Sequence, residues 1–181
     1  MVGSLRNPVK YTYDDLLTFP DDGLRREIID GELYVTPSPA TQHQVIVGNV
    51  YYLLRRHLAA HPAGHIFLAP LDVVFSKFDV VEPDLLFVSN ARRGVVTRKN
   101  IQGSPDLAIE VLSPSDSVRK VRSKVADWLS CGSAAALVLD PRRKVAELHR
   151  AGRVHVYAPP EVLMLDDVLP GWSLDLVDLF R

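Results

Sequence analysis

The chain has 181 residues, of which 47% are hydrophobic, and this is enough to build a core. Its formal net charge of −1 gives no overall basic field that would indicate binding to nucleic acid. Its single cysteine, Cys131, excludes an intramolecular disulfide. No apolar stretch approaches the roughly 20 residues that span a bilayer, and residues 1–8 lack the apolar segment of a signal peptide. We therefore expect a soluble, cytoplasmic protein with a single domain over residues 1–181.

Turn signals and apolar spacing divide the first half of the chain into short elements. Asp30-Gly31 between two short runs is a strong hairpin signal. Ser38-Pro39 is the expected cap and first-turn proline of a long helix with apolar residues at helical spacing. The expected elements are a short helix at 13–19, strands at 26–29 and 32–35, a helix at 41–61, and strands at 65–68, 71–75 and 80–88.

The second half reads as strands around one further helix. Ser113-Pro114-Ser115 is expected to open that helix and Gly132 to close it. Its expected apolar stripe consists of Val118, Val121, Val125, Trp128 and Leu129. The expected elements are a basic loop at 90–103, a strand at 106–112, a helix at 116–130, strands at 134–139, 145–149 and 154–157, and an ending at 165–180 that packs on the core. This order predicts an α/β or α+β fold with a mixed sheet.

Two carboxylates interrupt apolar, strand-like segments. Asp84 follows Pro83 in one of them, and Glu110 lies in the run 107–112. An ionised carboxylate in such a place is costly unless it is paired or binds a cation. Mg²⁺ is typically held by one or two protein carboxylates, which leaves room for phosphate and water. The pair therefore indicates metal-dependent phosphodiester chemistry; the alternative is a turn aspartate and a strand glutamate with a structural partner.

Lys124 and His43 are the candidates to assist the carboxylates. Lys124 has Val121 and Trp128 as neighbours on the second helix, so it flanks the buried face and could point back toward Asp84 and Glu110. There it could stabilise developing phosphate charge or orient the attacking water; otherwise it is a surface lysine with its stem buried. His43, at the apolar edge of the first long helix, could be a base or an accessory group, or could be structural.

Three more acidic residues could support a metal site. Glu27 and Glu32 flank the Asp30-Gly31 turn, and either could join the site if the hairpin lies beside it. Asp72 breaks another strand-like run and could be a supporting metal carboxylate.

Basic residues concentrate in one part of the chain, residues 92–124. The second helix begins with basic residues, although the dipole at a helix start favours anions. Such a start is suited to binding a polyanion. The alternative is a solvated loop and helix face. The candidate nucleic-acid-binding residues are Arg92, Arg93, Arg98, Lys99, Arg119, Lys120 and Arg122.

Several of these segments together resemble the Uma2 family, also called DUF820, of endonuclease-like proteins in the PD-(D/E)XK superfamily. The resemblance covers nearly the whole chain, and the stretch from Pro105 to Ser115 is its most specific part. The matching segments are Glu27 to Glu32, Pro37 to Pro39 with His43, Glu82 to Leu85, Pro105 to Ser115, Lys124, Gly132, Asp140-Pro141, and Leu169 to Phe180.

The resemblance implies a restriction-endonuclease-like core, a mixed sheet flanked by helices with extra C-terminal hairpin strands, and DNA cleavage that depends on Mg²⁺ or Mn²⁺. The superfamily's usual lysine two residues after the glutamate is absent, because Leu112 stands there. The resemblance points instead to Lys124. Three positions depart from the pattern of such proteins, namely Lys120, Trp128 and the pair Ala135-Ala136.

The sequence therefore predicts an endonuclease with DNA as partner, in which Asp84 and Glu110 hold the metal and Lys124 stabilises the transition state. A homodimer is expected, since one-site enzymes that cut a duplex often act in pairs. One rival is a module of the same fold that binds nucleic acid or protein with little cleavage. A second rival is a structural homo-oligomer in which Asp84 and Glu110 pair with buried basic residues, which predicts no metal effect.

Overall fold

The computed structural model describes residues 9–114 and 116–181, so the expectations for residues 1–8 and for Ser115 in the helix opening lie outside the described residues. Its helices are α1 (Tyr13–Leu16), α2 (Thr41–Ala60), α3 (Val118–Ser130) and α4 (Leu176–Leu179), with a 3-10 helix η1 (Asn90–Val95). Its strands are β1 (Arg25–Ile29), β2 (Glu32–Thr36), β3 (Gly64–Leu68), β4 (Val73–Ser76), β5 (Asp79–Val81), β6 (Leu85–Ser89), β7 (Ile101–Gln102), β8 (Leu107–Val111), β9 (Ala135–Asp140), β10 (Val145–Arg150), β11 (Arg153–Tyr157), β12 (Val162–Met164) and β13 (Ser173–Asp175).

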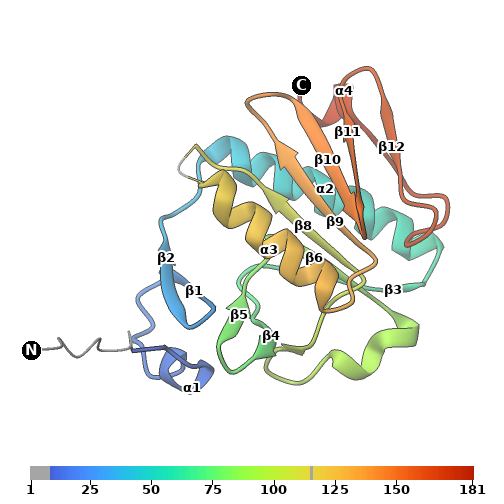
Figure 1. The fold of residues 1–181 in the computed structure, drawn as a ribbon. Helices are drawn as coiled ribbons and strands as arrows, with labels where there is room; N and C mark the ends of the chain where they lie inside the picture. The colour runs from blue at the N-terminus through green and yellow to red at the C-terminus, as the bar shows by residue number, and fades with distance from the viewer. Residues whose placement is uncertain (1–8, 115) are drawn as a thin grey trace, which may run out of the picture.

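The strands form two main sheets, which Figure 1 shows with the helices around them. The six-stranded sheet has the order β11-β10-β9-β8-β6-β3 and is mixed, because β8 and β9 run parallel while the other neighbours are antiparallel. The five-stranded sheet has the order β2-β1-β5-β4-β7, and β12 pairs with β13 as a separate hairpin. The predicted mixed sheet, flanking helices and C-terminal hairpin are confirmed.

The two long helices cover opposite faces of the six-stranded sheet (Figure 1). Leu107 and Ile109 of β8 pack in one hydrophobic cluster with α2 and with the C-terminal segment, as predicted for the chain's ending. Ala108 packs in another cluster with Trp128 of α3. Because side chains alternate along a strand, Glu110 lies in step with Ala108, on the face that α3 covers.

The strand predicted over residues 80–88 is wrong, because the structure divides it into β5 and β6. Glu82-Pro83-Asp84 separates them, and β5 joins the five-stranded sheet while β6 joins the six-stranded one. Pro83 has no N–H to donate to a ladder, so pairing cannot continue through it. The break leaves Asp84 at the junction of the two sheets.

Several element boundaries also differ from the prediction. Helix α1 is shorter than 13–19, and the N-cap of α2 is Ala40 rather than Ser38. Helix α3 begins after Ser117, and Val118 is 63% exposed, so this residue does not belong to the apolar stripe. Gly132 follows α3 with φ +103°, a conformation that favours glycine and confirms the predicted end of the helix. The predicted loop at 90–103 contains η1 and β7.

Gly64 is a position where the fold tolerates no side chain. It pairs with Ser89 across β3 and β6, and an added Cβ would collide with the Val88 carbonyl oxygen and the Phe87 ring. We expect Gly64→Ala to lower the free energy of unfolding by about 1–3 kcal/mol, measured by urea denaturation. Gly48 in α2 has no atom within 4 Å of an added Cβ, so Gly48→Ala should be neutral or stabilising by up to about 1 kcal/mol. Equal effects of the two substitutions would contradict this account.

Candidate active site

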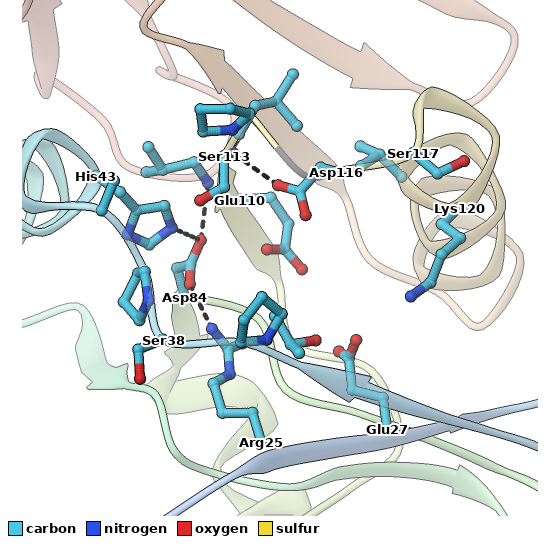
Figure 2. A pocket seen from close by; sticks show the side chains of 18 of the residues that line it. Arg25, Glu27, Ser38, His43, Asp84, Glu110, Ser113, Asp116, Ser117 and Lys120 are labelled. Carbon is cyan, nitrogen blue, oxygen red and sulfur yellow. Dashed lines mark hydrogen bonds and ion pairs between the residues drawn. The ribbon is translucent and has the colours of Figure 1, made fainter.

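A pocket of about 370 Å³ lies between the hairpin of β1 and β2, the start of α2, the end of β8 and the start of α3. Figure 2 shows charged side chains from all of these elements gathered around it. The charged and ionisable residues that line it are Arg25, Glu27, His43, Asp84, Glu110, Asp116, Lys120 and Lys124. Asp84, Glu110, Lys124 and His43, which the sequence singled out separately, are thus brought together.

Asp84 is buried and accepts three hydrogen bonds, which Figure 2 shows as dashed lines. Arg25 Nη1 lies 3.0 Å from Oδ1, while His43 Nε2 lies 3.1 Å and the Val111 amide nitrogen 2.9 Å from Oδ2. Burial alone would raise the pKa of Asp84, but the hydrogen bonds from His43 and Val111 and the charge of Arg25 lower this pKa to about 2. Asp84 is therefore ionised at neutral pH, and because a carboxylate only accepts, His43 Nε2 carries the proton.

Glu110 shares a buried lysine with Glu27. Lys124 Nζ contacts Glu110 Oε1 and lies 2.7 Å from Glu27 Oε1, and the side chain of Lys124 is only 8% exposed. Burial, with the negative charges of Asp84 and Glu27, raises the pKa of Glu110 to about 8 in spite of the Lys124 ammonium. Burial would lower the pKa of Lys124, but the two carboxylates prevail and raise it. The ionised form of Glu110 is therefore disfavoured at neutral pH unless a further cation compensates its charge.

The charges in and beside the pocket do not balance. Glu82, outside the pocket lining, also binds Arg25, whose Nε lies 3.2 Å from Glu82 Oε2. The carboxyl groups of this cluster are therefore those of Glu27, Glu82, Asp84 and Glu110, against the two cations of Arg25 and Lys124. With all four carboxyl groups ionised, the cluster would carry an excess of two negative charges, which one divalent cation would neutralise. Without such a cation, the raised pKa of Glu110 lets a proton take up part of this excess at neutral pH.

Asp84 and Glu110 offer the hard oxygen ligands that Mg²⁺ and Mn²⁺ prefer. Within residues 9–114 and 116–181, no group of three or more His, Cys, Asp or Glu side chains is arranged to hold a metal ion. Mg²⁺ does not require such a group, because it is commonly bound by one or two carboxylates and completes its shell with water and substrate phosphate. The two carboxylates and the negative excess around them fit such an ion.

Two helices begin at the pocket. Ala40 is the N-cap of α2 and Ser117 that of α3, and neither makes a side-chain capping hydrogen bond in the described structure. Neither helix carries an acidic residue in its first turn. Figure 1 shows both starting on the same side of the molecule. Free N–H groups and the positive ends of the helix dipoles favour an anion beside the carboxylates.

Of the two hairpin glutamates, Glu27 reaches the pocket and Glu32 does not. Glu32 is exposed at the turn end of the hairpin, where it pairs with Ile29 and accepts a 2.6 Å hydrogen bond from the Tyr34 hydroxyl. Glu27 pairs with Tyr34, two residue pairs farther from the turn. The position along the strand, rather than the face, thus keeps Glu32 away from the site.

Asp72 also lies outside the pocket. Its carboxylate accepts a 3.1 Å hydrogen bond from the hydroxyl of Tyr13 in α1, and that hydroxyl accepts one of 2.9 Å from the Asn100 amide. Asp72 therefore ties the N-terminal helix to the body of the protein and does not join the carboxylates of the pocket.

The basic stretch does not form one surface at the pocket. Of Arg92, Arg93, Arg98, Lys99, Arg119, Lys120 and Arg122, only Lys120 lines the pocket. Arg92 donates a 2.9 Å hydrogen bond to the carbonyl of Gly132, just past the C-terminal end of α3. The 13 residues of α3, a length of about 20 Å, separate that point from the pocket at the other end of the helix.

Arg25 is the site residue that the sequence reasoning missed. Its guanidinium binds both Asp84 and Glu82, which lie 59 and 57 residues farther along the chain. Arg25 and Glu27 occupy alternate positions of β1 and so share one face. Arg26 between them is charged as well, so no alternation in the sequence singles out Arg25.

Comparisons with known proteins agree with this fold. The family model Uma2, described as "Putative restriction endonuclease", matches residues 13–177. A crystal structure described as "a putative nuclease belonging to DUF820", from Anabaena variabilis, matches with a TM-score of 0.82 and 23% sequence identity, over 93% of this chain and 97% of that chain. At this identity the likeness establishes the fold alone. No curated protein matches the chain, and no helix of the described residues is long and apolar enough to cross a membrane.

Proposed function

The chain belongs to the Uma2 family, and we propose that it is a nuclease that hydrolyses phosphodiester bonds of DNA with Mg²⁺ or Mn²⁺. The observation that supports this most is the meeting of Asp84, Glu110 and Lys124 in one pocket. Buried carboxylates with an excess of negative charge suit a divalent cation, and the two helix starts beside them suit a phosphate.

Asp84 and Glu110 are the residues that would hold the metal ion. Such an ion, when bound, polarises the phosphate and lowers the pKa of the attacking water. Arg25 and His43 fix the Asp84 carboxylate by hydrogen bonds of 3.0 and 3.1 Å, so its oxygens are oriented before a ligand arrives. His43 thus acts through Asp84, as an accessory residue.

Lys124 is the residue to which we assign stabilisation of the transition state. Its ammonium contacts Glu110, and its raised pKa keeps it protonated at neutral pH. An ammonium fixed beside the reacting phosphate gains interaction energy as negative charge develops on the oxygens of the pentavalent phosphate. The site is mostly closed to water around this group, which strengthens the interaction further.

DNA is the proposed substrate, following the description of the family. The near-neutral net charge predicts weak nonspecific binding at physiological salt, so contacts at the pocket must supply much of the affinity. One such pocket cuts one strand at a time, and two copies of the chain would be needed to cut both strands of a duplex. On that ground we also propose a homodimer.

Supercoiled plasmid tests the proposed activity directly. We expect the purified protein to nick or linearise the plasmid with Mg²⁺ or Mn²⁺, because the metal neutralises the negative charge at Asp84 and Glu110. Cleavage should stop when EDTA is added and resume when the metal is restored. Gel electrophoresis of the plasmid forms measures this. Cleavage that persists unchanged in EDTA would contradict the metal-dependent mechanism.

A second candidate is a module that binds nucleic acid without cutting it. The observation that favours it is that both metal candidates already have cationic partners, Asp84 in Arg25 and Glu110 in Lys124. Such a module would bind DNA equally well with and without Mg²⁺ and would leave the plasmid intact.

A further inference from the structure

Lys120 is the third cationic side chain of the pocket besides Arg25 and Lys124. It lies half-buried in the first turn of α3, one turn before Lys124. Residues four apart on a helix share a face, with their Cβ atoms about 5–6 Å apart. Figure 2 shows the Lys120 side chain extending from the helix on the same side of the pocket as Glu27. The Lys120 ammonium is therefore one of the charges that line the pocket.

Lys120 differs from the other two cations in its partners. Arg25 binds Glu82 and Asp84, and Lys124 binds Glu27 and Glu110. Lys120 forms no salt bridge with any residue of the described part of the chain. Asp116, which precedes α3 and also lines the pocket, accepts a 2.6 Å hydrogen bond from the Ser113 amide. The charge of Lys120 is thus available to an incoming anion.

An aromatic ring holds Lys120 in place. Its Nζ lies 4.0 Å from the centroid of the Tyr34 ring, in strand β2 of the hairpin. A cation–π contact restrains an ammonium without supplying a negative charge that would neutralise it. Tyr34 therefore orients Lys120 beside the pocket and leaves its hydrogen-bond donors free.

We propose that Lys120 binds the phosphate adjacent to the scissile one, so that the site holds two consecutive phosphates of a nucleic-acid strand. This inference rests on the proposed function, which places the scissile phosphate at Lys124. The two lysines on one face of α3 would then each serve one phosphate. Lys120 is accordingly a specificity-determining residue, which favours a polynucleotide over an isolated phosphodiester.

Binding measured without divalent metal tests the contact apart from cleavage. We expect Lys120→Ala to weaken binding of a fluorescent oligonucleotide and to reduce the slope of log affinity against log salt by about one, since one phosphate contact is lost. The matched control is Lys77→Ala, because Lys77 is an exposed lysine over the Phe78 ring and lies outside the pocket. That control should leave the slope unchanged.

Kinetics test the assignment to the adjacent phosphate. We expect Lys120→Ala to raise KM for an oligonucleotide on the order of tenfold. Hydrolysis of bis(p-nitrophenyl) phosphate, which has one phosphate, should lose much less than hydrolysis of the oligonucleotide. Tyr34→Leu should give a smaller rise in KM for the oligonucleotide, and Tyr34→Phe, which keeps the ring, should give none.

The possible results separate this inference from the proposed function. An unchanged salt slope in Lys120→Ala overturns the inference, and if the wild-type protein still cleaves, the proposed function stands. Equal losses on both substrates also overturn it, because Lys120 would then act on the scissile phosphate. A reduced slope together with no cleavage by the wild-type protein supports the phosphate contact and counts against the nuclease.

Discussion

Asp84→Asn is expected to lower metal-dependent cleavage to background and to remove stabilisation by Mg²⁺ or Mn²⁺. Asparagine keeps the size of the side chain and one carbonyl oxygen, but it removes the negative charge that a divalent cation needs. With the carboxyl groups ionised, the charge excess of the cluster falls from two to one, and Glu110 is left as the only carboxylate of the Asp84–Glu110 pair. Because Arg25 and His43 both lie near 3 Å from this carboxylate, the variant also loses two charge-assisted contacts.

Thermal unfolding with and without Mn²⁺ measures the metal part of this prediction. A ligand that binds only the folded state at 100 times its Kd stabilises it by about 2.7 kcal/mol, so the wild-type melting temperature should rise clearly. Asp84→Asn should show no rise. Asp72→Asn is the control, since Asp72 is a partly buried carboxylate outside the pocket and should keep the response. An Asp84→Asn variant that Mn²⁺ still stabilises fully would contradict Asp84 as a metal ligand.

The elements of the fold follow from local patterns in the sequence. The Asp30-Gly31 turn, the apolar spacing of α2 and the glycine after α3 each act over a few residues, and the structure confirms all three elements. The two carboxylates could be found in the same way, because a charge inside an apolar run is conspicuous. Pro83 is the local signal against a single strand over residues 80–88, since a proline has no N–H to donate to a ladder.

The assembly of the site depends on contacts that no local pattern contains. Arg25 and Asp84 meet across 59 residues because β1 and β5 pair and bring the hairpin beside the junction of the sheets. In the opposite sense, Arg92 and Lys120 belong to one basic stretch of the sequence but lie at opposite ends of α3. Patterns along the chain therefore indicate a type of chemistry, whereas sheet pairing determines which residues line the pocket.

Lys124→Met is expected to reduce cleavage by about 10²–10³-fold and to destabilise the protein. Methionine retains the length and apolar stem of lysine but leaves Glu27 and Glu110 without their shared cation. Removing one partner of a buried ion pair typically costs about 3–5 kcal/mol, which chemical denaturation without metal would measure. The double variant Lys124→Met/Glu27→Gln should recover part of that stability, because one uncompensated carboxylate is gone, and should still fail to cleave.

Manganese separates a catalytic Lys124 from a purely structural one. Lys124 and a bound cation both neutralise Glu110, so Mn²⁺ should stabilise Lys124→Met at least as much as it stabilises the wild-type protein, while cleavage stays low. Arg143→Met is the control for loss of an ion pair, since the Arg143–Glu147 pair is surface-exposed and lies outside the pocket, and this variant should keep both stability and cleavage. If Mn²⁺ stabilises neither the wild-type protein nor Lys124→Met, the lysine and the carboxylates form a structural cluster. Full cleavage by a folded Lys124→Met variant would instead remove Lys124 from the chemistry.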